Sequence, residues 1–351
     1  MNREDVLRAI QANQTIEDAD LSGIDLSGAD LTGGRFERVS FRSANLSRVT
    51  IQKTGFRDCG FEGVCLDGTD LTRVDLRKAN LRGARFRGVT LYMTRMEEAD
   101  LSEADCSGTA FRWSPLQRIK LDRADLSNAR FEKAILGGAS LKQANFAGAD
   151  LVKTTFNGAD LTGARLRGAR FFKVLFRGCN LEGQNLQEAR FSQVNADGSN
   201  LKGADLSGAD LRMSNFSGAD LTGASLERAR AEHGMFKGTV LTEARMAGGT
   251  FSKAYFGEAD LSRADLTGVD LTNAVLDKAV CRAARFVRAT CTYADFSHAD
   301  LTAADFTEAG LFMARVHGIV EDHTLWDGAN RTALRGADPD LAEAEAWSPQ
   351  V

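Results

Sequence analysis

The stretch ADLSGIDLSGADL at residues 19–31, and its later counterpart GADLSGADLRMSNFSGADL at residues 203–221, set a five-residue repeat for the chain. We call the large apolar residue of each repeat its centre. Centres recur at every fifth residue from Ile16 to Val316, without insertion or deletion, and Leu or Phe fills 51 of the 61. The exceptions are Ile16, Ile51, Met96, Cys106, Ala196, Ala231, Met246, Cys281, Cys291 and Val316.

A second position of the repeat, two residues before each centre, is also restricted. It holds Ala, Val, Thr, Ser, Cys or Gly, most often Ala, except at Gln14, Ile24, Ile119 and Gln184. Neither this position nor the centre is ever charged, although 26% of the chain is charged. Charged residues are almost never buried unless they are paired, so their absence predicts that both positions lie inside the fold.

A period of five fits neither an α-helix nor a flat strand, and it indicates a chain that turns a corner every five residues. One such unit cannot bury its apolar face alone, so coils must stack. A longer period of twenty is visible two residues after the centre. One column holds Gly138, Gly158, Gly178, Gly198, Gly218 and Gly238, whereas the column from Lys53 to Lys253 holds no Gly. Twenty residues therefore predict four sides per coil.

Residues 14–316 resemble the pentapeptide-repeat family, whose motif reads A(D/N)LXX. The resemblance implies an all-β solenoid, a right-handed quadrilateral β-helix of about fifteen coils with short helical caps. Residues 1–13 are expected to form an N-terminal capping helix with Asn2 as N-cap, and its Leu7 and Ile10 would cover the first coil. Residues 317–351 are expected to form an irregular C-terminal cap, with a short helix over 340–347 whose Leu341 and Trp347 close the last coil. Pro115 is expected to cause a local bulge because it cannot donate to a ladder.

Two outer sides differ in composition from the rest and are candidate partner-binding surfaces. The lysine side, with centres 31, 51, 71 and onward, interleaves basic, aromatic and Met residues, a composition that is typical of interfaces. The glycine side, with centres 36, 56, 76 and onward, carries apolar residues beside its Gly column, as interfaces often do. The alternatives are a turn type without Gly on the lysine side and scattered apolar residues on the glycine side. The lysine-side candidates are Tyr92, Met93, Trp113, Lys133, Lys153, Phe172, Lys173, Met213 and Tyr293, and the glycine-side candidates are Ile135, Leu175, Met235, Tyr255 and Val275.

The residues that usually carry catalysis or metal binding form no strong motif here. His317 and His323, near Glu321 and Asp322, are the best metal pair, but a capping loop explains them better. Five of the six Cys take inward positions, and Cys65 alone faces outward. We find no phosphate-binding Gly loop and no GxSxG or HExxH motif. We therefore expect no enzyme activity, no cofactor and no metal.

Composition and resemblance together set the functional hypotheses. The chain of 351 residues has a net charge of −4, no long apolar run and a polar N-terminus, so we expect a cytoplasmic protein with no membrane partner. The leading hypothesis is a bacterial protein–protein interaction scaffold, since the segments at residues 3–31 and 339–347 are similar to those of pentapeptide-repeat proteins associated with type VI secretion, which are thought to act as accessory or loading factors. The alternative is a DNA mimic that binds DNA gyrase, as quinolone-protecting members of the family do. A homodimer that forms through an apolar side or a cap is a further hypothesis. The weak net charge disfavours direct binding of nucleic acid.

Overall fold

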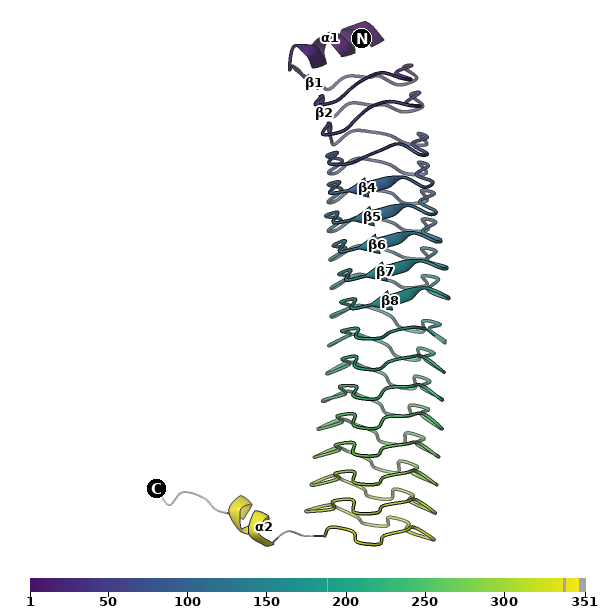
Figure 1. The fold of residues 1–351 in the computed structure, drawn as a ribbon, viewed down its shortest axis with the longest axis vertical. Helices are drawn as coiled ribbons and strands as arrows, with labels where there is room; N and C mark the ends of the chain where they lie inside the picture. Colours follow the sequence, from purple (N-terminus) through teal and green to yellow (C-terminus); the bar gives the residue numbers. More distant parts are fainter. Residues whose placement is uncertain (188, 337–338, 347–351) are drawn as a thin grey trace, which may run out of the picture. The chain divides into compact units, whose positions relative to one another are not determined.

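A computed structural model of the protein describes residues 1–187, 189–336 and 339–346, and these fall into two compact units. Unit 1 is Met1–Asn185 and unit 2 is Leu186–Val351. In each unit the backbone winds in coils that pair in parallel with the coils before and after them (Figure 1). No helix among the described residues has the length and apolar character needed to cross a bilayer.

The pairing register matches the predicted period of twenty residues. Within unit 1, Asp20 pairs with Ser40, and the next side pairs Asp25 with Asn45. Within unit 2, Tyr255 pairs with Val275 in the same way. Bridges recur at every fifth residue, so each coil of twenty residues has four sides that hydrogen-bond to the neighbouring coils.

Among the residues that the structure describes, the sides lengthen into regular strands in unit 1 alone. Two parallel sheets form there, one of three strands on the glycine side and one of five on the lysine side. The first contains β1 (Thr15–Glu17), β2 (Arg35–Glu37) and β3 (Gly55–Arg57), and the second contains β4 (Thr90–Tyr92), β5 (Ala110–Arg112), β6 (Arg130–Glu132), β7 (Asp150–Val152) and β8 (Arg170–Phe172). The centre of each strand points inward, and its two neighbours point outward.

Both restricted positions of the repeat are buried, as the sequence predicts. Apart from the half-buried Val316, the centres are almost inaccessible to solvent, and the Ala residues two before them fill the remaining interior. Centres of one side stack on each other from coil to coil. The rings of Phe216, Phe236 and Phe256 lie nearly parallel, with centroids 5.4 and 4.8 Å apart. Stacked rings at this spacing gain attraction beyond the burial of their area.

Polar residues at the inner position satisfy their hydrogen bonds within the wall. Thr94 Oγ1 donates to the carbonyl of Leu71 at 2.7 Å, and Thr239 Oγ1 donates to that of Phe216 at 2.8 Å. Each accepting carbonyl belongs to a centre and already accepts the backbone N–H three residues later, as Phe216 does from Ala219 at 3.0 Å. A carbonyl has two lone pairs, so the hydroxyl uses capacity that an Ala at this position would leave unused.

All four corners use one turn geometry. The residue two after the centre has positive φ whether it is Gly or not, for example +67° at Gly138 and +54° at Lys133. The left-handed conformation costs a residue with a Cβ roughly 1–2 kcal/mol. The interpretation that the lysine side uses a different turn type is therefore wrong, and the two sides differ only in the side chains that they carry at the corner.

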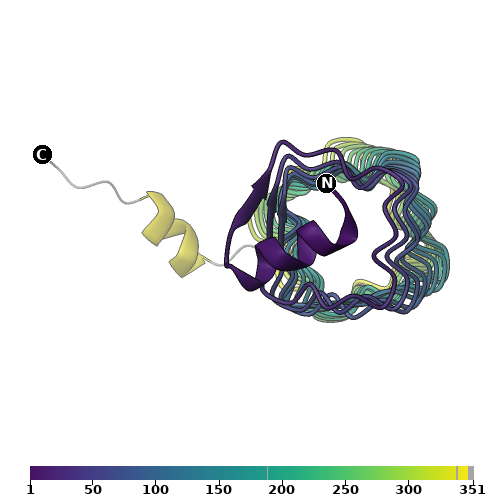
Figure 2. The ribbon, with the colours of Figure 1, turned by 90° about the horizontal axis from the view of Figure 1, so that it is seen from above.

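The N-terminal helix α1 (Arg3–Gln11) contacts β1 and lies over the first coils (Figure 2). Asn2 caps it as expected, accepting from the Asp5 N–H at 3.0 Å, while the Asp5 carboxylate accepts from the Asn2 N–H at 3.1 Å. Val6 and Ala9 form its buried face, whereas Leu7 and Ile10 are only half-buried. Ile10 nevertheless reaches the first coils as expected, since its Cδ1 would lie 3.3 Å from a Cβ at Gly34, and Val6 and Ala9 extend the packed face.

The expectation that the chain becomes irregular after Val316 is wrong. The coil pattern does not end at Val316, because Asp300 pairs with Val320, Asp305 with Leu325 and Arg315 with Arg335. Two of the three centres there, Glu321 and Arg331, are charged, whereas the third, Trp326, stacks on Phe306 with ring centroids 4.6 Å apart. The second helix, α2, spans Pro339–Ala346. The side chains of Leu341 and Trp347, the proposed closing residues, lie outside what the structure describes.

Pro115 also causes no bulge. It pairs with Ile135, and its carbonyl accepts the N–H of Met96 at 3.0 Å. Its missing N–H removes a single bond to the preceding coil, and the other bonds of the side hold the register.

Candidate partner-binding surface

The lysine side of unit 1 is the outer face of the sheet formed by β4 to β8. Each strand presents one residue before and one after its buried centre, and a corner residue follows. The corner residues of the five strands form a column of Met93, Trp113, Lys133, Lys153 and Lys173. Because consecutive coils in a sheet lie about 4.8 Å apart, these side chains are close neighbours.

Cation–π contacts organise this column. Lys133 Nζ lies 3.7 Å from the centroid of the Trp113 ring, although the tryptophan remains 46% exposed. Lys173 Nζ lies 5.2 Å from the centroid of the exposed Phe172 ring. Such contacts stabilise an exposed aromatic by roughly 0.5–1 kcal/mol and hold it at the surface. Met93, Lys153 and Lys173 are exposed, while Tyr92 and Lys133 are half-buried.

Ion pairs on the same sheet neutralise part of its positive charge. Arg112 Nε donates to Glu132 at 2.9 Å, and Arg170 pairs with Asp150 at 3.2 Å. A hollow of about 340 Å³ lies between these groups, and it is lined by Thr90, Ala110, Arg112, Arg130, Phe131, Glu132, Asp150 and Val152. The lysine column thus borders a hollow whose own charges are mostly paired within the sheet.

The glycine-side candidates do not form one continuous strip. In unit 1, Ile135 and Leu175 are exposed, but Thr155 separates them on the coil between. In unit 2, Met235, Tyr255 and Val275 pair in succession, and of these three only Met235 is exposed, at 46%. The hydroxyl end of the Tyr255 ring lies over Gly257, whose lack of a Cβ leaves room for it. The expectation of apolar residues exposed over about seven coils is therefore corrected to short groups within each unit.

In unit 2, residues of both candidate sides meet at one corner. Tyr293 and Phe312 make an edge-to-face contact with ring centroids 5.9 Å apart. A hollow of about 300 Å³ beside them is lined by Asn273, Ala274, Val275, Tyr293, Asp295, Met313, Arg315 and Arg335. Met213, further along the lysine side of this unit, is the most exposed of the candidates at 61%. A partner at this corner would contact both sides at once.

Sequence reasoning missed two exposed apolar residues, Val320 and Leu325, because it treated residues 317–337 as irregular. The repeat did indicate them, since both occupy the position one residue before a centre and pair with Asp300 and Asp305, which hold the same position on the preceding coil. The repeat was predicted to end because the charged centres Glu321 and Arg331 interrupt the apolar pattern.

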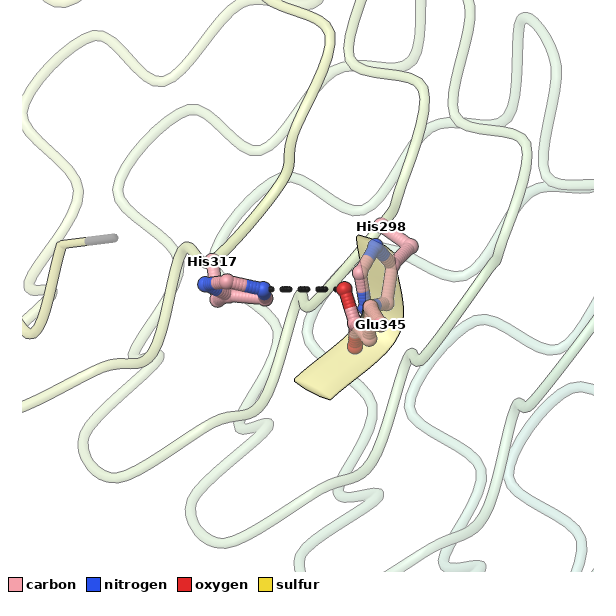
Figure 3. Close-up of side chains that lie close together, drawn as sticks. All are labelled: His298, His317 and Glu345. Atoms are coloured by element: carbon pink, nitrogen blue, oxygen red, sulfur yellow. Dashed lines mark hydrogen bonds and ion pairs between the residues drawn. The ribbon is translucent and has the colours of Figure 1, made fainter. Parts of the chain in front are cut away.

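The structure also brings together a polar cluster that the sequence did not suggest. Glu345 of α2 lies between His298 and His317, with a carboxylate oxygen 3.1 Å from His298 Nε2 and another 3.3 Å from His317 Nε2 (Figure 3). His323, the predicted partner of His317, is exposed and is not part of this cluster. The hydrogen bond from His317 holds the pKa of Glu345 below its usual range.

The cysteines lie where the repeat predicts. Cys59, Cys106, Cys179, Cys281 and Cys291 are buried, and Cys65 is exposed. Burial raises the pKa of the Cys59 thiol to about 12 and that of Cys179 to about 11, and it raises the pKa of Cys106, Cys281 and Cys291 further. These five thiols are therefore not nucleophiles at neutral pH.

Parallel pairing at intervals of twenty residues, four corners per coil and a core of stacked Leu and Phe define the class: the protein is a β-solenoid of five-residue repeats. A family model of eight pentapeptide repeats matches successive and overlapping stretches from residue 19 to residue 314. The chain therefore belongs to the pentapeptide repeat family.

Solved structures of the same family give further matches. A trypsin-treated variant of QnrB1, a plasmid-mediated fluoroquinolone resistance protein, is 22% identical over 60% of this chain and 91% of its own, with a TM-score of 0.33. HetL, involved in heterocyst differentiation regulation in Nostoc sp. strain PCC 7120, is 23% identical over 95% of this chain and 96% of its own, with a TM-score of 0.17. A pentapeptide repeat protein from the Arabidopsis thaliana thylakoid lumen is 32% identical over 32% of this chain and 67% of its own, with a TM-score of 0.16. A search of curated proteins finds no match.

Proposed function

We propose that the protein is a non-enzymatic scaffold that binds another protein through the corner between its lysine and glycine sides. The observation that carries the proposal is the column of Trp113, Lys133, Lys153 and Lys173, in which cations hold an aromatic ring at the surface. Tryptophan is among the residues that most often dominate binding energy at protein interfaces. The turn geometry supports the proposal. Gly would fit these positive-φ positions without strain, and the chain places bulky residues there instead.

The proposal includes the finer architecture that the family resemblance implies, a right-handed quadrilateral β-helix of about fifteen coils. Such a body gives a partner a regular array of binding positions at intervals of about 4.8 Å. A scaffold of this kind needs no catalytic group, which agrees with five cysteines whose thiols are buried and protonated. We place it in the cytoplasm, where unpaired cysteines remain reduced.

The test is a charge reversal with a matched control. The variant carries Lys133→Glu, Lys153→Glu and Lys173→Glu. The control carries Lys120→Glu, Lys142→Glu and Arg167→Glu, which change the net charge equally on the two remaining sides of unit 1. Parent, variant and control are used to capture proteins from extracts of the source bacterium, and the recovered partner is then purified and its affinity measured.

Reversal on the lysine side should weaken binding at least tenfold, whereas the control should bind like the parent. The far-ultraviolet circular dichroism of all three should be the same. Equal affinity of all three proteins, or an equal loss in variant and control, would count against the lysine side as the binding surface.

A role as accessory or loading factor of a type VI secretion system is the more specific form of the proposal. It rests on the resemblance of the end segments, residues 3–31 and 339–347. Deletion of the gene in a bacterium that carries such a system should lower the export of one effector and spare the assembly of the apparatus. Unchanged export of all effectors would remove this form and leave the scaffold proposal standing.

The DNA-mimic alternative needs a continuous acidic surface. The ion pairs contradict such a surface, because they place an arginine beside each of several acidic side chains. In unit 1, Arg118 pairs with Glu98 and Arg123 with Glu103 on neighbouring coils. In unit 2, Arg263 pairs with Glu243 in the same way, at 2.8 Å. A gyrase supercoiling assay with a quinolone tests the alternative: we expect neither inhibition nor protection at micromolar protein.

A further inference from the structure

The last coils and α2 enclose a site with the chemistry of a transition-metal centre. The ligand atoms that His298, His317 and Glu345 offer all lie within 4.8 Å of one another. The two imidazole rings meet edge to face, with centroids 5.1 Å apart, and the nitrogens that face the carboxylate are both Nε2 (Figure 3). We propose that His298, His317 and Glu345 bind one Zn²⁺ ion, which fastens α2 to the coils of unit 2.

The spacing of the ligand atoms suits zinc. Bonds of about 2.0–2.2 Å in tetrahedral geometry place neighbouring ligand atoms roughly 3.3–3.5 Å apart. The two nitrogen–oxygen distances here are 3.1 and 3.3 Å, and all three ligand atoms lie within 4.8 Å of one another, so small movements of the carboxylate and the two rings would bring them around one ion. Two imidazoles with one carboxylate form a common protein ligand set for Zn²⁺, and a water molecule completes the coordination.

The fold positions each ligand before any ion arrives. His298 and His317 lie on neighbouring coils, joined by the hydrogen bond from the His298 N–H to the His317 carbonyl at 2.7 Å. Gly318 has no Cβ where the His298 ring lies, since a Cβ there would be 2.6 Å from Nδ1. His317 is almost fully covered, with only 4% of its side chain exposed. Rigid, partly enclosed imidazoles lose little freedom on binding a metal, which favours affinity.

The third ligand comes from a different element, and this gives the ion a structural role. Glu345 lies on α2, 28 residues after His317, and both hydrogen bonds of the cluster involve its carboxylate. The last coil exposes Val320 and Leu325, and metal binding would hold a helix beside it. The ion replaces two hydrogen bonds with three coordinate bonds, which resist both solvent and proteolysis better.

Zinc binding by the full-length protein tests the site directly. After treatment with EDTA and buffer exchange, the protein is titrated with ZnCl₂ by calorimetry, and we expect one ion per chain. Loss of an outer-shell group alone costs about 10–100-fold in metal affinity, so loss of a ligand in His298→Asn or Glu345→Gln should cost at least as much. Asn tolerates the positive φ of +57° at this position, which keeps the backbone intact. MgCl₂ and CaCl₂ should not bind, because imidazole suits neither cation.

A matched control separates this site from the pair that the sequence suggested. His323→Gln removes an exposed histidine six residues after His317 and should bind zinc like the parent. If His323→Gln loses binding while His298→Asn keeps it, the ion belongs to the other pair and the proposal is overturned. Equal zinc affinity in all variants, or no zinc binding by the parent, overturns it as well.

Tryptic digestion gives a second readout that reports on α2. Arg335 is exposed and is the last Lys or Arg of the chain, so cleavage after it releases residues 336–351 with Glu345. Zinc should slow this release at least severalfold in the parent and in His323→Gln, but not in His298→Asn or Glu345→Gln. Equal release with zinc and with EDTA in the parent would show that the ion does not fasten α2. Neither readout involves a binding partner, so this proposal and the scaffold function can fail independently.

Discussion

Replacement of Phe236 by Ala is the sharpest test of the stacked interior. Phe236 is fully buried in unit 2, its ring lies between those of Phe216 and Phe256 at 5.4 and 4.8 Å, and its edge meets the ring of Phe251 at 5.8 Å. A buried Phe→Ala change costs about 3–5 kcal/mol through lost transfer energy and the cavity that remains. Because the ring contacts three others, we expect a value near the upper end, about 4–5 kcal/mol.

The control for this change is Phe312→Ala in the same unit. Phe312 follows a centre, is 39% exposed and makes a single aromatic contact, to Tyr293. Its loss should cost about 1 kcal/mol or less. Unfolding in urea, followed by far-ultraviolet circular dichroism, measures both free energies, and amide hydrogen exchange shows whether the change stays within nearby coils. Equal losses in the two variants, or a loss below 1 kcal/mol for Phe236→Ala, would refute the division into inner and outer positions.

Three further results are expected. Thr239→Val should lower the free energy of unfolding by only about 1 kcal/mol, because the Phe216 carbonyl keeps its bond from the Ala219 N–H; a loss above 3 kcal/mol would show that the hydroxyl does more than fill a spare lone pair. A thiol reagent should label one cysteine of the native protein, Cys65, and all six in denaturant, since five are buried; rapid labelling of a second thiol in the native state would contradict this. Hydrogen bonds from Arg212 hold the pKa of Asp210 below its usual range against the opposing effect of partial burial, so the ionised carboxylate stabilises the fold fully at neutral pH and this stabilisation is lost as the pH falls below about 4. Asp210→Asn should therefore lose less stability than the parent between pH 5 and pH 3. Identical pH profiles of stability in the two proteins would contradict this role of Asp210.

The sequence was sufficient for the interior because the repeat is strict there. A charged residue at Leu206 or Ala204 would be buried without a partner, so the exclusion of charge from both positions predicts burial without further information. The twenty-residue register followed from the glycine column, whose members lie on successive coils, as the pairing of Tyr255 with Val275 on that side shows.

The sequence was less informative where charged residues interrupt the apolar pattern. Residues 317–335 keep the coil because their N–H and C=O groups still pair and Trp326 still stacks on Phe306, but the charged centres Glu321 and Arg331 hid the continuation. The bulge expected at Pro115 is absent because the backbone hydrogen bonds around it outweigh the loss of one N–H donor.

The His298, His317 and Glu345 cluster depends on where α2 lies, which no local pattern encodes. One signal was available: His298 and His317 are nineteen residues apart, which places them on adjacent coils. Glu345 could not be added from the sequence, because nothing in residues 339–347 indicates which coil the helix contacts.

Distances between spin labels within unit 2 test the central claim, that every twenty residues complete one coil. Labels at 193 and 273, and at 193 and 313, occupy equivalent corners separated by four and six coils, in a Cys65→Ser background. At about 4.8 Å per coil, electron–electron double resonance should give mean backbone separations of roughly 19 and 29 Å. Separations that do not grow in proportion to the number of coils, or that place the 193 and 313 labels within 20 Å, would contradict the account.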